Sequence, residues 1–263
     1  MADLSVKEMA DFIRNEVRIK TLPIAVKFLK DKAQFPEKTR QPSVALGKRV
    51  TICQGVTMAR SYGWTVGLTR EDLVCVPAMI AFGFTDSPNQ AESLTRLFCE
   101  IDFASSEEGA RKEMDSMHRF ENREYEAMVL APLAKNLFEP DTIVVFGNPA
   151  QMMRFIQAWT YVKGGRVAGN FGGKVECDEY LIAPFKTQAA RVSIPGNGDR
   201  IFSGTQDDEM AFSIPGADLN DLVRGLAESG KKIGARYPVP PYQNFQPEFP
   251  KAHVNLGKEL GIF

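Results

Sequence analysis

The amino-acid sequence predicts an α+β fold, in which a mixed β-sheet carries packed helices and an extended proline-rich tail follows. Short apolar runs rich in β-branched residues alternate with longer segments whose apolar residues recur at helical spacing. Strand-like runs gather in the last third of the chain, and no low-complexity linker separates two domains. We therefore expect a single α+β domain over residues 1–237 and an extended tail over residues 238–263.

The composition is typical of a folded protein with a sizeable core. Of the 263 residues, 44% are hydrophobic and 25% are charged. Lys and Arg number 32 against 33 Asp and Glu, so the net charge is −1 and no overall field favours nucleic acid or an anionic membrane. The charged N-terminus lacks a signal-peptide core, and no stretch reaches the roughly 18 apolar residues that span a bilayer. These features predict a cytoplasmic protein with neither a nucleic-acid nor a membrane partner.

In the first half of the chain, helix and strand signals follow one another. Ser5 and Glu8 form a capping-box pattern that begins an amphipathic helix. Alternation over residues 24–28 predicts a strand, and the polar segment 31–48, broken by prolines, predicts a loop. A helix around Cys53 is predicted to end near Gly63, and a strand over 64–68 and helical turns from Thr69 follow it. Beyond these, the sequence predicts a charged helix over 107–126 and a strand over 127–134.

The second half begins with the clearest local structure. A buried strand over 143–146 ends at a glycine, and Asn148 caps a helix whose first residue is Pro149. Three further strands are predicted in "YLIAPF", "ARVSIPG" and "EMAFSIPG", followed by a helix from Asp218 to about Lys232. The tail contains "YPVPPYQNFQPEFP", and its prolines predict extended chain that crosses the protein body or contacts a neighbouring subunit.

Four cysteines are the main candidates for a metal site. Cys53, Cys75, Cys99 and Cys177 are widely spaced, and no Cys-x-x-Cys pair signals zinc or an iron–sulfur cluster. Packing in a core is the competing interpretation, because free cysteine is among the most buried residue types. Cys53 and Cys75 each lie near a predicted helix start, where unpaired N–H groups favour a thiolate with a lowered pKa. Cys177 follows a glycine-rich loop, whereas Cys99 has an ordinary core context.

The other chemical signals are weaker. "KGGRVAGNFGG" lacks the Gly-Lys-Ser/Thr ending of a phosphate loop and follows a helix, so it predicts a flexible loop. Two histidines leave few candidates for a nucleophile–base pair. Asn148 and Gln151 lie where a strand end meets a helix start, a common ligand position, although capping alone explains Asn148. Asp199 and Arg200 follow Gly-Asn-Gly and could present an anion-binding fork or form a surface ion pair.

Several of these motifs together resemble a known family. "TICQGVTMAR", "LVCVPAMIAFGF", "EPDTIVVFGNPAQMMRFIQAWTY", "GNGDR" and "DDEMAFSIPG", in this order, resemble the uncharacterised family called domain of unknown function 169, over roughly residues 10–240. The family occurs largely in archaea and anaerobic bacteria, which implies that an oxygen-sensitive cofactor is plausible. The positions carried over are Cys53 with Gln54, Cys75, Cys177, Asn148 to Gln151, and Gly198 to Arg200. The resemblance also implies a further cysteine just before Gly-Asp-Arg, where this chain has Gly196 and Asn197; a four-thiolate site would here lack one ligand.

Three functions follow as hypotheses. In the first, Cys53, Cys75 and Cys177 bind an iron–sulfur cluster or another soft metal such as zinc, in a redox or electron-transfer role. Around this cofactor lie Gln54, Asn148, Gln151, Asp199 and Arg200. In the second, the helix start at Asn148 and the Arg200 side chain hold a small anionic metabolite, and the cysteines only pack. In the third, the proline-rich tail makes the chain a subunit of a homo-oligomer. No substrate or reaction follows from the sequence.

Overall fold

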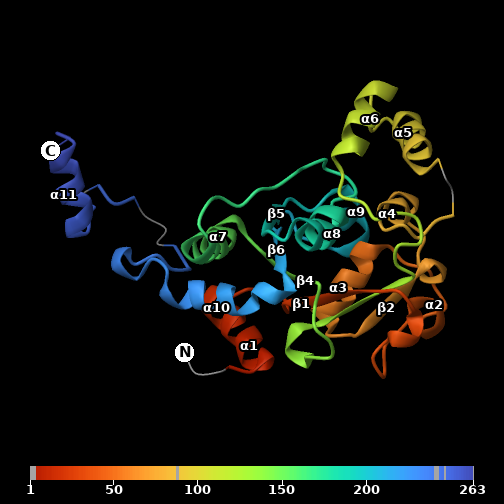
Figure 1. Ribbon diagram of the computed structural model, residues 1–263, viewed down its shortest axis with the longest axis horizontal. Coiled ribbons are helices and arrows are strands. Elements are labelled where there is room, and N and C mark those ends of the chain that lie inside the picture. The colour runs from red at the N-terminus through yellow and green to blue at the C-terminus, as the bar shows by residue number, and fades with distance from the viewer. Residues whose placement is uncertain (1–3, 87–88, 240–242, 246, 263) are drawn as a thin grey trace.

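The computed structural model describes residues 4–86, 89–239, 243–245 and 247–262, and it confirms the α+β class. A six-stranded sheet in the order β2-β3-β1-β4-β6-β5 forms the centre of the molecule (Figure 1). The strands are β1 (Ile24–Leu29), β2 (Val66–Thr69), β3 (Ala127–Pro132), β4 (Thr142–Gly147), β5 (Arg191–Ser193) and β6 (Met210–Pro215). The helices are α1 (Val6–Val17), α2 (Pro42–Ala45), α3 (Ile52–Tyr62), α4 (Val76–Ala81), α5 (Gln90–Glu100), α6 (Glu107–Ser116), α7 (Pro149–Lys163), α8 (Cys177–Thr187), α9 (Asn197–Ser203), α10 (Leu219–Glu228) and α11 (Lys251–Glu259).

All pairings between the named strands are antiparallel, whereas the sequence predicted a mixed sheet. Parallel contacts among the described residues are isolated bridges, such as that between Arg40 and Val66. Beside the central strand β1, the Asp141 carboxylate accepts hydrogen bonds from the Phe28 amide and from Lys27 Nζ, each at 2.8 Å. These bonds tie the start of β4 to β1 by side chain as well as backbone.

Both faces of the sheet are covered by helices, because successive side chains of a strand point to opposite faces. On one face, Ala25 of β1 and Val145 of β4 pack with α1, α7 and α10. On the other face, Val26 and Phe146 pack with α3, α4 and α8. The result is a three-layer arrangement, and the second face carries the candidate site.

The segment "YLIAPF", predicted as a strand, belongs to helix α8. All residues from Tyr180 to Pro184 are buried, so this stretch of the helix has no exposed face to give it a helical period. A short, fully buried helix of this kind cannot be told from a buried strand by its apolar run. Pro184 stands inside the helix, which further obscured the signal.

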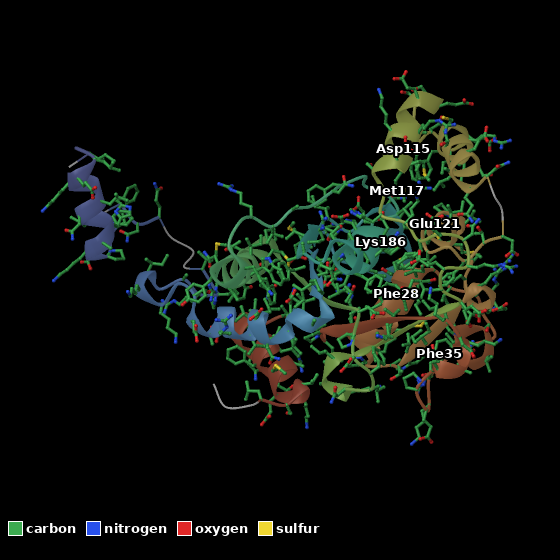
Figure 2. All side chains as sticks on the ribbon, viewed as in Figure 1. Phe28, Phe35, Asp115, Met117, Glu121 and Lys186 are labelled. Atoms are coloured by element: carbon green, nitrogen blue, oxygen red, sulfur yellow. The ribbon has the colours of Figure 1, made fainter. Side chains whose placement is uncertain are left out.

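Two parts of the chain extend from this body. Helices α5 and α6 form a hairpin with a small core of its own around Phe98 and Met114. In Figure 2, Asp115 and Met117 mark this hairpin above Lys186 of α8. The proline-rich tail leaves the sheet on the opposite side and ends in α11, a helix that the sequence did not predict (Figure 1). The oligomer contact through this tail remains a prediction. No helix in the described part of the chain is long and apolar enough to cross a membrane.

The loop over residues 31–48 is fastened to the body by one buried carboxylate. Asp72 accepts hydrogen bonds from Gln41 Nε2, Ser43 N, Ser43 Oγ, Thr69 N and Thr69 Oγ1, at 2.6 to 3.2 Å. Burial alone would raise the pKa of Asp72, but the hydrogen bonds from Ser43 and Thr69 outweigh burial and lower it. The carboxylate therefore organises the loop in its ionised form.

Asp72→Ala is expected to lower the free energy of unfolding by about 2–4 kcal/mol, because several buried donors lose their acceptor. Asp31→Ala is the matched control: Asp31 accepts one bond, from the Ala33 amide, in an exposed turn, and its loss should cost below about 1 kcal/mol. Urea unfolding of both variants measures the difference. Equal effects of the two substitutions would contradict the role assigned to Asp72.

Candidate functional site

Three cysteines that are distant in the sequence line one cavity. Cys53, Cys75 and Cys177 border a space of about 300 Å³ on the α3–α4–α8 face of the sheet, together with Asp199. Cys99 lies outside it and packs against the core of the α5–α6 hairpin. All four thiols are free. The structure therefore separates the cysteines into a group of three and one packing residue.

The cavity lies where the first turns of several helices meet. Cys53 is the second residue of α3, Cys75 is the N-cap of α4, and Cys177 is the first residue of α8. Gly198 and Asp199, in the first turn of α9, complete this side of the lining. Local sequence fixes these positions, since a Thr51–Gln54 capping box starts α3 and Pro77 occupies the first turn of α4.

Burial dominates the electrostatics of the three thiols. It raises the pKa of Cys53 to about 12, with the Asp199 carboxylate as the second cause. Burial also raises the pKa of Cys75 and, more strongly, that of Cys177. The sequence-based expectation that helix starts lower these pKa values is therefore wrong, because desolvation outweighs the helix N–H groups. Without a bound cation the thiols are protonated at neutral pH.

Hydrogen bonds fix two of the groups at the cavity. Cys53 Sγ lies 2.9 Å from Thr51 Oγ1 and donates to the Gly198 carbonyl at 3.5 Å. The Asp199 carboxylate accepts from the Tyr180 hydroxyl at 2.6 Å and from the Gly196 amide at 3.1 Å. Burial raises the pKa of Asp199. These contacts hold one acidic group in the lining of the same cavity as the thiols.

The wall and the rim of the cavity are mainly apolar. Phe98 forms part of the wall, and the partly exposed side chains of Ile101, Phe103 and Phe202 stand at the rim. Lys174 supplies a positive charge: its Nζ lies 2.7 Å from Glu113 and 5.1 Å from the centre of the Phe98 ring. No pattern in the sequence indicated that residues of the α5–α6 hairpin line one side of the site.

The glycine-rich loop before Cys177 wraps around a carboxylate. The amides of Gly172 and Gly173 both donate to Glu176 Oε1 at 2.6 Å, and Ser193 Oγ donates to Glu176 Oε2 at 3.1 Å. The loop therefore binds an internal side chain rather than a phosphate. Lys174 and Glu176 were not predicted as site residues, although both fall within the three positions before Cys177.

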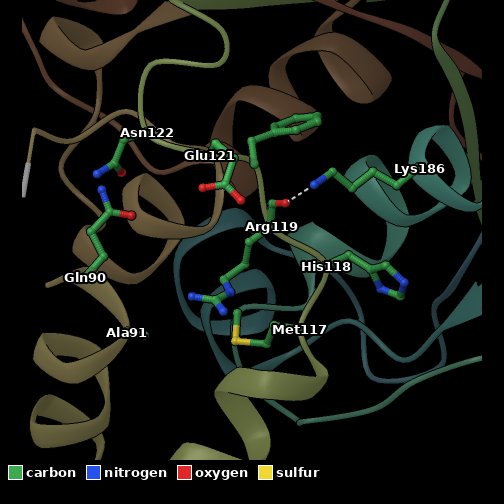
Figure 3. Close-up of a pocket in the computed structure, with 9 residues that line it drawn as sticks. Gln90, Ala91, Met117, His118, Arg119, Glu121, Asn122 and Lys186 are labelled. Carbon is green, nitrogen blue, oxygen red and sulfur yellow. Dashed lines mark hydrogen bonds between the residues drawn. The ribbon is translucent and has the colours of Figure 1, made fainter. Parts of the chain in front are cut away.

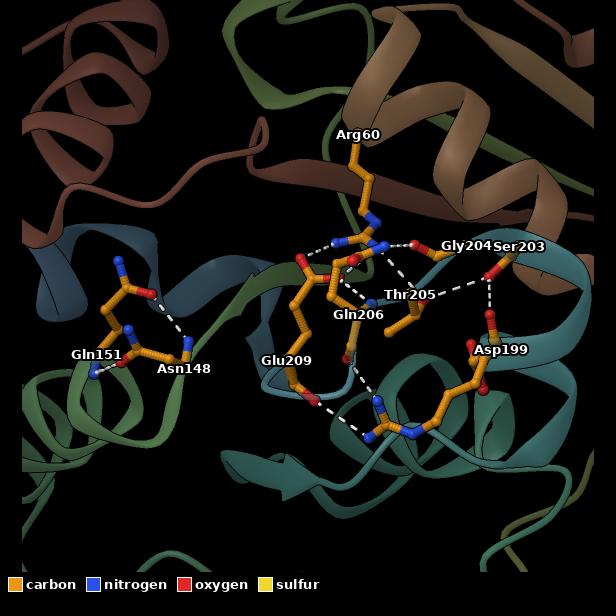
Figure 4. A network of polar contacts seen from close by, with 10 residues as sticks. Arg60, Asn148, Gln151, Asp199, Ser203, Gly204, Thr205, Gln206 and Glu209 are labelled. Atoms are coloured by element: carbon orange, nitrogen blue, oxygen red, sulfur yellow. Dashed lines mark hydrogen bonds and ion pairs between the residues drawn. The ribbon is translucent and has the colours of Figure 1, made fainter.

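The remaining predicted residues are not among those that line the cavity. Figure 4 shows two of them, Asn148 and Gln151, hydrogen-bonded to each other. Gln54 belongs to the capping box of α3. Asn148 and Gln151 form a capping box at the start of α7, and Gln151 Nε2 also donates to the carbonyls of Val17 and Arg18 at 3.0 and 2.9 Å. Arg200 donates to the carbonyls of Gln206 and Glu209. The structure thus brings together Cys53, Cys75, Cys177 and Asp199, and it gives Gln54, Asn148, Gln151 and Arg200 roles in local structure.

The spacing of the thiols limits what they can bind as they stand. Within the described ranges, no group of three or more His, Cys, Asp or Glu side chains is arranged to hold a single metal ion. A tetrahedral zinc site would need sulfur atoms about 3.5–4 Å apart, given Zn–S bonds of about 2.3 Å. Among the described residues, the three thiols therefore line a common cavity without forming a ready site for a single ion.

Comparison with known proteins identifies the family. The model of DUF169, described as "Uncharacterised ArCR, COG2043", matches residues 13–225. The chain belongs to the DUF169 family. The matched range includes every cysteine and ends before the proline-rich tail.

Among curated proteins, the DUF169 chain is 29% identical over 204 residues to the uncharacterised protein MJ0308 of Methanocaldococcus jannaschii. This match covers 77% of the chain and 85% of the archaeal protein. No solved structure matches the chain. Because the family and this relative are both described as uncharacterised, the function must be argued from the site itself.

Proposed function

We propose that the cavity of Cys53, Cys75 and Cys177 binds an iron–sulfur cluster through thiolate ligands, which gives the protein a redox or electron-transfer role. The observation that carries this proposal is the way the fold groups three of the four cysteines. Three thiols from three separate helix starts line one cavity, and the fourth thiol lies elsewhere. Thiolates are the ligands that iron–sulfur clusters use, and they also suit zinc.

The chemistry of the cavity fits such a group. Ligation requires deprotonated thiols, and the N–H groups of the surrounding helix starts stabilise the negative charge that ligation creates. The space of about 300 Å³ has room for a group of several metal atoms. When bound, a cluster would supply one-electron chemistry inside a largely apolar wall. A reducing cytoplasm would keep the three thiols available for it.

Three cysteines leave a four-thiolate ligand set incomplete. Asn197, one of the two residues that stand where the family resemblance implies a fourth cysteine, lines this same cavity. The proposed cluster therefore has one coordination position that no cysteine of this chain occupies. This position would be open to a side-chain oxygen or to an added ligand.

The other two hypotheses have less support. The polar groups of Asn148 and the guanidinium of Arg200 are engaged with protein partners, and the two residues do not share a cavity among those described. An anion site between them is not favoured by this geometry. An oligomer held by the tail would be compatible with the cluster proposal, and sedimentation of a chain without residues 238–263 tests it.

Metal and sulfide analysis of the intact chain tests the cluster proposal. Purified without oxygen and supplied with iron, sulfide and a reductant, the protein is expected to retain equal amounts of iron and acid-labile sulfide, at about two or more of each per chain. A visible absorption that bleaches on reduction should accompany them. A zinc content of about one per chain with no iron would indicate that the site binds zinc and not a cluster. Negligible iron, sulfide and zinc would overturn the metal proposal.

A further inference from the structure

A second cavity, of about 390 Å³, lies beside the base of the α5–α6 hairpin. It is formed by the first turn of α5, the segment 117–122 that follows α6, and the last turn of α8 (Figure 3). Its polar lining comes from Gln90, His118, Arg119, Glu121, Asn122 and Lys186. Cys53, Cys75 and Cys177 do not line it, so it is separate from the proposed cluster site.

Basic side chains outnumber acidic ones in this cavity. His118, Arg119 and Lys186 face a single carboxylate, that of Glu121. The chain as a whole carries a net charge of −1, so this excess is local. The first two residues of α5, Gln90 and Ala91, also line the cavity and bring the positive end of an 11-residue helix to it.

Lys186 and His118 each contact groups of the protein, whereas the Arg119 guanidinium is available to a ligand. Lys186 Nζ donates to the Arg119 carbonyl and lies 5.3 Å from the centre of the Phe120 ring. His118 Nδ1 lies 3.1 Å from the buried Glu179 carboxylate. No carboxylate oxygen of the described residues lies within ion-pair distance of the Arg119 guanidinium. Figure 3 shows this guanidinium standing among the other lining side chains.

We propose that this cavity binds the oxyanion group of a small acidic metabolite, a phosphate or a carboxylate, with Arg119 as the principal contact. A guanidinium binds either group through two parallel N–H bonds, and the lysine and the helix start that also line the cavity add positive charge. The volume lies within the range of about 300–1,000 Å³ that small-molecule sites occupy. The amide side chains of Gln90 and Asn122 add to the polar lining of the cavity.

Calorimetric titration with inorganic phosphate and with succinate tests the proposal, at an ionic strength held constant with potassium chloride. Arg119→Gln is expected to weaken binding of the preferred anion at least tenfold, and Lys186→Gln to weaken it by a smaller factor. Arg166→Gln removes an exposed arginine elsewhere and should leave the affinity unchanged. Tighter binding of phosphate would assign a phosphorylated ligand, and tighter binding of succinate a carboxylate.

The result that overturns the proposal is binding of neither anion below about 10 mM, or equal affinity of the Arg119→Gln and Arg166→Gln proteins. Because Arg119 is only partly buried, its replacement should leave the fold intact, and circular dichroism checks this. The test does not depend on the cluster. It is carried out on protein without metal, so failure of one proposal does not imply failure of the other.

Discussion

Replacing Arg60 by methionine is expected to lower the free energy of unfolding by about 3–5 kcal/mol, the range for removing one partner of a buried ion pair. Arg60, in the last turn of α3, is buried and holds Glu209 with two hydrogen bonds, of 2.7 and 3.0 Å. The same guanidinium donates to Thr205 Oγ1 at 3.2 Å and lies 4.1 Å from the centre of the Phe146 ring (Figure 4). One side chain thus joins a helix, the loop before β6 and the sheet.

The loss of stability in Arg60→Met comes mainly from the Glu209 carboxylate, which stays buried without its partner. Burial alone would raise the pKa of Glu209, but the hydrogen bonds from Arg60 outweigh it and lower the pKa. A carboxylate with a lowered folded pKa adds stability above its unfolded value, near 4.3, and this stability disappears as the pH falls through the folded pKa. In the variant, burial acts without the partner, so the pKa of Glu209 should rise above the unfolded value.

The stability difference between the two proteins should therefore be largest near pH 7 and shrink as the pH falls toward about 3–4. Urea unfolding at a series of pH values, on reduced protein without metal, measures it. Arg60→Met/Glu209→Met removes both charges and is expected to recover part of the loss, since no unpaired charge stays buried. A single variant as stable as the double variant across this range would contradict the argument.

Much of the fold followed from local patterns in the sequence. The capping boxes at Ser5 and Asn148 placed the starts of α1 and α7, and period-two alternation placed β1. Two elements departed from the prediction in different ways. Residues 177–184 of α8 are all buried, so this part of the helix carries no amphipathic period. The predicted helix over 107–126 ends at Ser116. Local patterns also do not state which strands pair, and so they could not give an antiparallel sheet.

The part of the candidate site that could be predicted consists of its three cysteines and Asp199. Cys53 and Cys75 lie beside helix starts that capping and proline signals reveal, which is why both positions could be proposed. Gln54, Gln151 and Asn148 were attached to the same site although a capping box already uses their side chains. Chain position could not show that the α5–α6 hairpin supplies the wall, because Phe98 meets Cys177 only through the tertiary fold.

Single alanine substitutions should separate the cavity cysteines from the packing cysteine. In Cys53→Ala, Cys75→Ala and Cys177→Ala, reconstituted iron and sulfide are each expected to fall below about one fifth of the wild-type amount. With only three thiols at the cavity, the loss of one leaves two ligands, too few to hold a cluster whose usual ligand set is four. Cys99→Ala is the matched control, since Cys99 packs in the hairpin core and should leave the iron content unchanged.

Loss of folding must be distinguished from loss of ligands in this series. Cys177 is buried in the main core, and its truncation to alanine creates a small cavity that costs about 1 kcal/mol, whereas Cys75 is only half-buried and should cost less. Thermal melts of the metal-free proteins measure this cost. If iron content followed melting temperature across the four variants, the thiols would be packing residues. If instead Cys75→Ala kept a near wild-type melting temperature yet lost its iron, ligation would be the direct explanation. Full iron retention in all three cavity variants would contradict the ligand assignment.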